Sequence, residues 1–252
     1  MKAKGKTDVG RNRKNNEDFI YVPGKNDVVQ NLYIVADGMG GYNGGEIASS
    51  LAVSSFVKYI KKEQKKREMV DIPDLLTEAT LVANKAVHKK SRSDRQFSEM
   101  GTTLVAATVV DHIAYVIYVG DSRAYLYREG KLLQLSTDHS YVMDLVNSGE
   151  ITKEEAWTHP KRNMITRAVG ISEKLKVDMA TKEVYPTDLL LLCTDGLSGM
   201  LSDSEMEKIL EITVGDLEEK VTALVDAANE RGGKDNVSVI LIKDLGGRGS
   251  CY

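Results

Sequence analysis

Short connections between strand-like segments constrain this chain more than any other feature of its sequence. Four neighbouring apolar stretches, rich in β-branched and aromatic residues, are joined by turns of only two to four residues. Parallel strands need a crossover of about a dozen residues or more, so these segments can pair only as antiparallel neighbours. The middle of the chain is therefore predicted to be an antiparallel meander, not a doubly wound sheet. Its strands are expected at residues 102–110, 113–119, 124–127 and 131–135.

Paired helices flank runs of strands in the rest of the chain. This arrangement predicts an α+β fold in which two antiparallel β-sheets form a central sandwich with helices on both sides. We expect residues 1–245 to form a single domain, with an excursion beside the core at about 140–170, and residues 246–252 to be a tail. Asn43 and Glu46 have capping-box spacing at the start of the first helix. Helices are expected at 45–60, 73–90, 140–148, 203–210 and 216–231, and further strands at 19–22, 32–36, 176–184, 189–194 and 237–242.

The composition excludes several classes of protein. The chain has 252 residues, 42% of them hydrophobic and 28% charged, and a formal net charge of -3. These values are ordinary for soluble globular proteins, and the chain lacks the excess of positive charge that nucleic-acid-binding proteins have. No apolar run approaches the length of a membrane span, and two cysteines form neither a disulfide framework nor a zinc motif. We therefore expect a cytoplasmic protein without membrane or nucleic-acid partners.

Acidic residues recur where predicted strands begin or end. If these ends lie at the same edge of the sandwich, the carboxylates would repel one another unless divalent cations neutralised them. The ligands are all oxygens, which favours Mg²⁺ or Mn²⁺ over zinc or copper. Two such ions can activate a water for attack on phosphorus. The acidic residues concerned are Glu17, Asp18, Asp37, Asp121, Asp195 and Asp235.

Asp37 and the basic residue Arg13 each have a simpler interpretation as well as a functional one. Asp37 with Gly38 is an Asp-Gly pair, which in isolation is typical of a turn. Five glycines within residues 38–45 would equally let a metal ion or a phosphate approach the main chain. Arg13 offers a guanidinium fork for two phosphate oxygens, although charges near a terminus are also typical of a solvated loop.

Seven motifs occur in a characteristic order between Thr7 and Ile242. They are Arg13 with Glu17-Asp18, D-G-M-G-G at 37–41, G-T-T at 101–103, G-D-S-R at 120–123, D-H-S at 138–140, T-D-G-L at 194–197 and D-N at 235–236. In this order they resemble the metal-dependent type 2C protein phosphatases, in their bacterial form. The resemblance implies the β-sandwich of that family and the hydrolysis of phosphoserine and phosphothreonine in proteins. It also implies that the excursion is the family's flap, which influences which protein substrates enter.

The resemblance assigns roles in catalysis and metal binding. Asp37 would bridge two core Mn²⁺ or Mg²⁺ ions, the Gly38 carbonyl would help to hold one of them, and Asp195 and Asp235 would complete the other. Three further residues would have supporting roles. Asp121 would bind a third, weaker ion. Glu17 and Asp18 would contact the ions through water molecules or support the residues that bind them.

One position departs from the family pattern. Animal relatives have histidine directly after the Asp-Gly pair, as the proposed general acid, whereas this chain has Met39. The proton for the leaving group could come from a water on a metal, from His139 or from His159, and the sequence does not choose between them.

Three functions are consistent with these motifs. The favoured one is a serine/threonine protein phosphatase, acting as a monomer on phosphorylated proteins and opposing a Ser/Thr kinase. A metal-dependent phosphatase of small phosphomonoesters would use the same chemistry. An inactive phosphatase-like binding module would be expected to lack ligands, but Arg13 and all the acidic positions are present.

Overall fold

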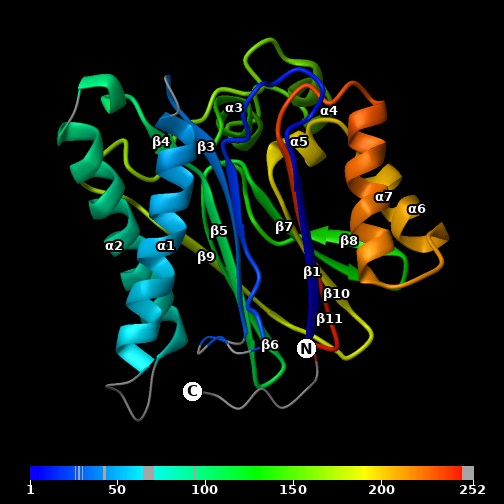
Figure 1. Cartoon of the computed structure of the whole chain (residues 1–252). Helices are drawn as coiled ribbons and strands as arrows, with labels where there is room; N and C mark the ends of the chain where they lie inside the picture. Colours follow the sequence, from blue (N-terminus) through cyan, green and yellow to red (C-terminus); the bar gives the residue numbers. More distant parts are fainter. Residues whose placement is uncertain are drawn as a thin grey trace.

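Two antiparallel sheets lie face to face at the centre of the computed structural model (Figure 1). The structure describes residues 1–245, except 26, 28, 30, 42, 43, 65–70 and 94. The tail expected at 246–252 and the helix cap expected at Asn43 therefore lie outside the described residues. Within the described part of the chain, the predicted α+β sandwich is confirmed.

The first sheet has the strand order β1-β11-β10-β7-β8, and each neighbouring pair is antiparallel. The sequence analysis missed β1 because this strand reads K-A-K-G-K-T-D, in which lysines alternate with small residues. Lysines suit an edge strand, where charge discourages pairing with another chain. The strands are β1 (Lys2–Asp8), β7 (Arg123–Arg128), β8 (Lys131–Gln134), β10 (Leu189–Cys193) and β11 (Val237–Lys243).

The second sheet has the order β2-β3-β5-β6-β9, and β4 pairs with the end of β3. The turn considered at Asp37 and Gly38 is wrong, because β3 continues to Met39. Its last residues pair with β4, Gly38 opposite Thr102 and Met39 opposite Gly101. The strands are β2 (Asp18–Tyr21), β3 (Leu32–Met39), β4 (Gly101–Thr102), β5 (Leu104–Val110), β6 (Ile113–Val119) and β9 (Asp178–Glu183).

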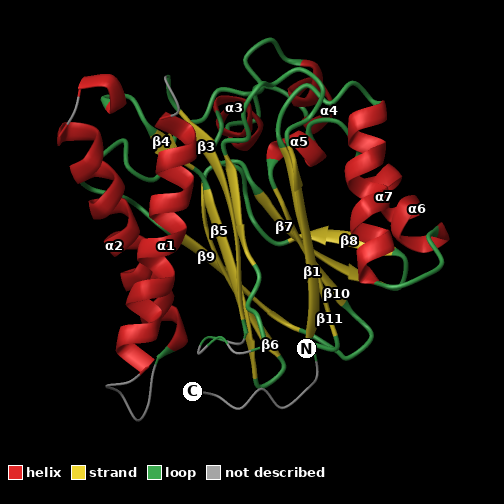
Figure 2. Cartoon of the chain, viewed as in Figure 1, coloured by secondary structure: helices red, strands yellow, loops and turns green. Residues whose placement is uncertain are grey.

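Helices cover both outer faces of the sandwich (Figures 1 and 2). The long pair α1 and α2 packs on the second sheet, and α5, α6 and α7 pack on the first. A short 3₁₀ turn, η1, follows α2. These elements are α1 (Gly44–Gln64), α2 (Ile72–Ser93), η1 (Arg95–Phe97), α5 (Asp195–Ser198), α6 (Asp203–Ile212) and α7 (Leu217–Glu230).

Apolar side chains fill the spaces between these layers. One buried cluster joins α1 and α2 to the second sheet, another lies between the two sheets, and another joins the first sheet to α5–α7. Strand β5 illustrates the consequence: it is covered on both faces, so its sequence L-V-A-A-T-V-V is nearly continuous apolar residues. This packing fixes the positions of the strand ends.

The predicted excursion lies at one end of the sandwich, where loops and short helices gather (Figure 2). We call residues 140–170 the flap segment. It contains α3 (Tyr141–Asn147), capped by the Ser140 side chain, and α4 (Lys153–Thr158), which begins with a capping box at Thr152. The short α4 was not predicted, because its six residues provide too little apolar periodicity.

Candidate active site

The acidic residues that the sequence singled out meet at the end of the sandwich beside the flap segment. Asp18 begins β2 and lies opposite Asp37 of β3 in the strand register. Asp195 begins α5 directly after β10, and Asp121 lies between β6 and β7. The charges of Asp18, Asp195, Asp121 and Asp235 all act on Asp37. The structure therefore brings these carboxyls together around Asp37.

Burial and mutual repulsion oppose the ionisation of this cluster. Burial, followed by the charges of Asp18 and Asp195, raises the pKa of Asp37 well above its ordinary value. Burial likewise raises the pKa of Asp18 to about 7, and it raises the pKa values of Asp121 and Asp195. A positive charge bound among these groups would remove the repulsion and favour their ionised forms.

Unpaired carboxylate oxygens show where such a charge would fit. Among the described residues, Asp18, Asp121 and Asp195 each have a buried Oδ1 without a hydrogen-bond partner. Buried polar atoms nearly always have partners, and a set of hard oxygens suits a divalent cation such as Mg²⁺ or Mn²⁺. No three His, Cys, Asp or Glu residues in the described ranges form a preassembled metal-binding group.

Two threonines hold the backbone of Asp37. The Asp37 carbonyl accepts from the Thr103 amide and from the Thr102 hydroxyl, both at 2.8 Å. The Asp37 amide donates to Thr103 Oγ1 at 2.9 Å. The G-T-T motif at 101–103 thus positions Asp37, a role that the sequence analysis did not assign to it.

Gly38 permits the close approach of β3 to the first turn of α1. A Cβ added at Gly38 would lie 2.1 Å from the Gly45 carbonyl oxygen and 2.5 Å from the Glu17 carbonyl oxygen. The Gly38 amide donates to that Glu17 oxygen at 3.1 Å. A side chain at position 38 would therefore separate β3 from α1.

Asn236 and Thr194 are further residues whose contacts sequence reasoning missed. Asn236 Oδ1 accepts from the Glu17 amide at 2.8 Å, and its Nδ2 donates to two carbonyls of the N-terminal segment. The Thr194 hydroxyl donates to Asp18 Oδ2 at 2.9 Å. Both residues adjoin an aspartate of the cluster in their motifs, which was the available signal.

Arg13 lies at the margin of the cluster with its side chain half-exposed. Its Nη2 forms an ion pair with Asp235 Oδ2 at 2.7 Å. Burial alone would lower the pKa of Arg13, but the hydrogen bond to Asp235 and the charges of Asp235 and Glu17 raise it. Arg13 thus lies in an exposed loop, as the simpler interpretation expects, and its ion pair with Asp235 holds it beside the cluster.

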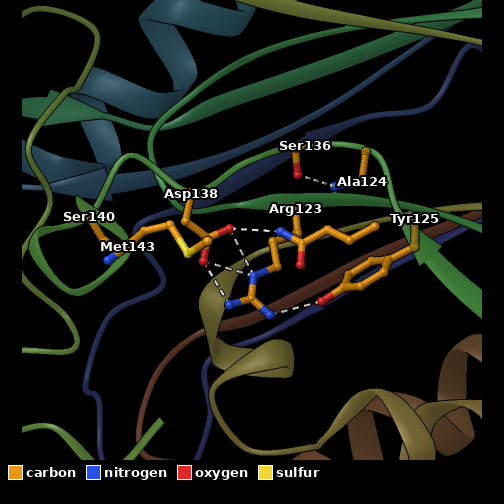
Figure 3. Close-up of polar contacts among 8 residues, drawn as sticks. Arg123, Ala124, Tyr125, Ser136, Asp138, Ser140 and Met143 are labelled. Atoms are coloured by element: carbon orange, nitrogen blue, oxygen red, sulfur yellow. Dashed lines mark hydrogen bonds and ion pairs between the residues drawn. The ribbon is translucent and has the colours of Figure 1, made fainter. Parts of the chain in front are cut away.

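Arg123 is a more deeply placed cation beside the cluster. Figure 3 shows its guanidinium between Asp138 and Tyr125: Nη2 donates to Asp138 Oδ2 at 2.7 Å, and Nη1 donates to the Tyr125 hydroxyl at 2.9 Å. The charge of Arg123 counteracts the rise in the pKa of Asp121 and of Asp195. The last residue of the G-D-S-R motif thus supplies positive charge near its aspartate.

Neither candidate histidine is placed as a proton donor to a substrate. His139 is buried, its Nδ1 accepts from the Gly120 amide at 3.0 Å, and its Nε2 faces Asp178 Oδ2 at 2.9 Å. Burial and the charge of Arg167 lower the pKa of His139. The ring therefore braces the backbone beside Asp121. His159 is the C-cap of α4, where its Nδ1 accepts from the Lys161 amide.

A cavity of about 590 Å³ opens next to the cluster. Its lining includes Asp121 and Asp195 of the cluster, Lys153 and Trp157 of the flap segment, and residues at the start of α6. A space of this size next to the carboxyls can receive a segment of polypeptide.

Known proteins share both this sequence and this arrangement. The sequence model of protein phosphatase 2C matches residues 9–241. The serine/threonine phosphatase stp of Listeria welshimeri is 40% identical over 243 residues, which is 96% of each chain. This chain belongs to the protein phosphatase 2C family. The predicted family and enzyme class are confirmed: the chain is a protein phosphatase with phosphorylated proteins as substrates and metal-dependent catalysis.

Solved structures of the protein phosphatase 2C family have the same fold. The serine/threonine phosphatase PstP/Ppp of Mycobacterium tuberculosis superposes with a TM-score of 0.84 at 32% identity, over 95% of this chain and 97% of that one. A structure of the PstP catalytic domain in complex with two manganese ions superposes with a TM-score of 0.82, also at 32% identity, over 95% and 96% of the two chains. Among the described residues of this chain, no helix is long and apolar enough to cross a membrane.

Proposed function

We propose that this phosphatase hydrolyses phosphoserine and phosphothreonine in proteins with the help of Mn²⁺ or Mg²⁺ held by the carboxylate cluster. The observation that carries the proposal is the set of buried, unpaired carboxylate oxygens of Asp18, Asp121 and Asp195 around Asp37. Divalent cations in such a site neutralise the carboxylates and activate water for attack on phosphorus.

The chain's own residues divide the work of binding these ions. In the proposal, Asp37, the Gly38 carbonyl, Asp195 and Asp235 would hold the two core ions. The motif order and the convergence of these residues support this assignment. Three other residues have supporting roles in the proposal: Asp121 serves a weaker third ion, and Glu17 and Asp18 act through water or from behind the ligands.

Arg13 is proposed to bind the substrate phosphate. One Nη atom is engaged by Asp235, and the half-exposed guanidinium retains further N–H groups that can face an incoming phosphate. The ion pair fixes the fork before substrate arrives, which reduces the entropy lost on binding. Asp235 in this way links the proposed metal site to the proposed phosphate site.

The cavity next to the cluster is wide enough for a phosphorylated side chain together with its flanking residues. Its volume of about 590 Å³ exceeds what a phosphate group needs and leaves room for neighbouring residues of a polypeptide.

We propose a single catalytic domain over residues 1–245 that acts as a monomer in the cytoplasm, opposite a Ser/Thr kinase. Light scattering on the purified chain measures the oligomeric state.

A comparison of substrates tests this function. In the presence of Mn²⁺, kcat/KM for a phosphothreonine peptide should exceed that for a sugar phosphate or a nucleoside monophosphate by at least tenfold. A preference for a small phosphomonoester would favour the alternative phosphatase. Absence of hydrolysis of every substrate, in a folded protein supplied with Mn²⁺, would favour the binding module.

A further inference from the structure

The last residues of the flap segment, together with the three residues that follow it, form backbone contacts with Thr102 and His139, which in turn contact residues of the site. We call residues 164–173 the return segment. At its start, Ile165 bridges to Ser140 and the Thr166 amide donates to the His139 carbonyl. Further along, Val169 bridges to Thr102 through two backbone hydrogen bonds of 3.0 and 2.8 Å.

Each of these ties leads to a carboxylate of the cluster. Thr102 is the residue whose hydroxyl donates to the Asp37 carbonyl at 2.8 Å. His139 bonds to both the amide and the carbonyl of Gly120, the residue before Asp121. The return segment is therefore connected by chains of hydrogen bonds to the backbone of Asp37 and to the backbone beside Asp121.

The Asn84 side chain of helix α2 forms hydrogen bonds to the return segment. Asn84 Oδ1 accepts from the Gly170 amide at 2.7 Å, and Nδ2 donates to the carbonyls of Ser172 and Glu173 at 2.9 and 3.2 Å. Asn84 is only 1% exposed, so water cannot replace these bonds if the amide is removed.

The contact between α2 and the return segment is also close in its packing. Gly170 has φ +93°, and a Cβ there would lie 2.2 Å from Val87 Cγ1 of α2. Only glycine fits this position without moving the segment. The Asn84 hydrogen bonds and the contact between Gly170 and Val87 together position the return segment against α2.

We propose that Asn84 is a positioning residue for the metal-binding site, acting on Asp37 through residues 170, 169 and 102. The proposal rests on the proposed function of the cluster. Loss of the Asn84 amide removes three hydrogen bonds between α2 and the return segment, which loosens the Val169–Thr102 pairing beside Asp37. Partners that hydrogen-bond directly to metal ligands typically contribute tenfold to a hundredfold in metal affinity, so a residue that acts through Thr102 should contribute less.

Titration of the full chain with Mn²⁺ by isothermal calorimetry tests this proposal. Asn84→Ala should raise the Kd for Mn²⁺ by about threefold to tenfold, less than the loss of a direct partner of a ligand would. At saturating Mn²⁺, KM for a phosphothreonine peptide should stay within twofold of the wild-type value. Thr80→Ala is the matched control, because Thr80 is fully buried in the same helix and, among the described residues, its hydroxyl bonds to the Leu76 carbonyl of α2 alone. Its Kd for Mn²⁺ should stay within twofold of wild type.

The possible outcomes separate this inference from the proposed function. If wild type binds Mn²⁺ and Asn84→Ala binds it equally well, or if Thr80→Ala weakens binding as much, the positioning role is wrong. If wild type itself does not bind Mn²⁺, the proposed function fails first. Should Asn84→Ala not fold, Asn84→Asp keeps the acceptor for the Gly170 amide and carries the same prediction with a smaller rise, and an unchanged Kd in that variant overturns the proposal.

Discussion

Asp18 is buried and Asp37 and Asp195 are half-buried, and the crowding of their carboxyl groups costs stability unless the charges are compensated. Arg13 and Arg123 supply part of the compensation from the margin, each through an ion pair with an aspartate. The position of these aspartates at the ends of strands could be predicted from the sequence. The hydrogen bonds that join Thr102 and Thr103 to the Asp37 backbone and Asn236 to the Glu17 amide could not be predicted, because they join residues far apart in the chain.

Arg13→Ala should mainly raise KM for a phosphothreonine peptide, by about tenfold or more, because hydrogen bonds to a charged phosphate contribute about 1.5–3 kcal/mol. Steady-state kinetics at saturating Mn²⁺ measure the change. Lys14→Ala removes a neighbouring exposed positive charge and should alter KM much less. A fall in kcat alone would contradict the role of Arg13 in substrate binding.

Asp18→Asn should stabilise the metal-free protein at pH 7.5. The folded pKa of Asp18 is about 7, above its unfolded value of roughly 3.9, so the folded state binds more protons between these values. The free energy of unfolding contributed by this group therefore falls as pH rises through that window. Thermal unfolding in EDTA should show a Tm that declines from pH 5 to 7.5 in wild type and declines less in the variant. Equal slopes would contradict the raised pKa.

Among the secondary-structure elements, those with long apolar periodicity were predicted and those defined by pairing were not. The central strands and the long helices follow local patterns, and their ends were mostly predicted to within a few residues. Strand β1 is recognisable only from its partner β11, and β4 only from its pairing with the end of β3. The extension of β3 through Asp37 was missed for this reason, since a turn dipeptide is overridden by tertiary pairing.

Gly38→Ala should destabilise the junction of β3 and α1, since the new Cβ would lie 2.1 Å from the Gly45 carbonyl oxygen. Overpacking of this kind costs about 1–3 kcal/mol, and the cost is measured by urea unfolding. Gly41→Ala is the matched control, because a Cβ there meets nothing within 4 Å. Equal stability of the two variants would show that β3 and α1 can separate at no cost.

At the scale of the whole molecule, the sandwich serves to bring the ends of strands from both sheets together (Figure 1). Asp18 and Asp37 come from the second sheet, and Asp195 and Asp235 adjoin strands of the first. The recurrence of aspartate at strand ends indicated this meeting on the condition that those ends lie at the same edge of the sandwich, and the structure meets that condition. The flap segment and its cavity depend on irregular backbone, so their shape could not be predicted from periodicity.

Phosphate release by chelator-treated protein is the most direct test of the central claim, that the carboxylate cluster uses divalent cations to hydrolyse phosphorylated proteins. After EDTA treatment and its removal, the wild-type chain should release no phosphate from a phosphothreonine peptide until Mn²⁺ is added. Asp37→Ala and Asp195→Ala, folded by circular dichroism, should stay inactive at every Mn²⁺ concentration. Hydrolysis that survives the chelator, or near-wild-type turnover by either variant, would contradict the claim.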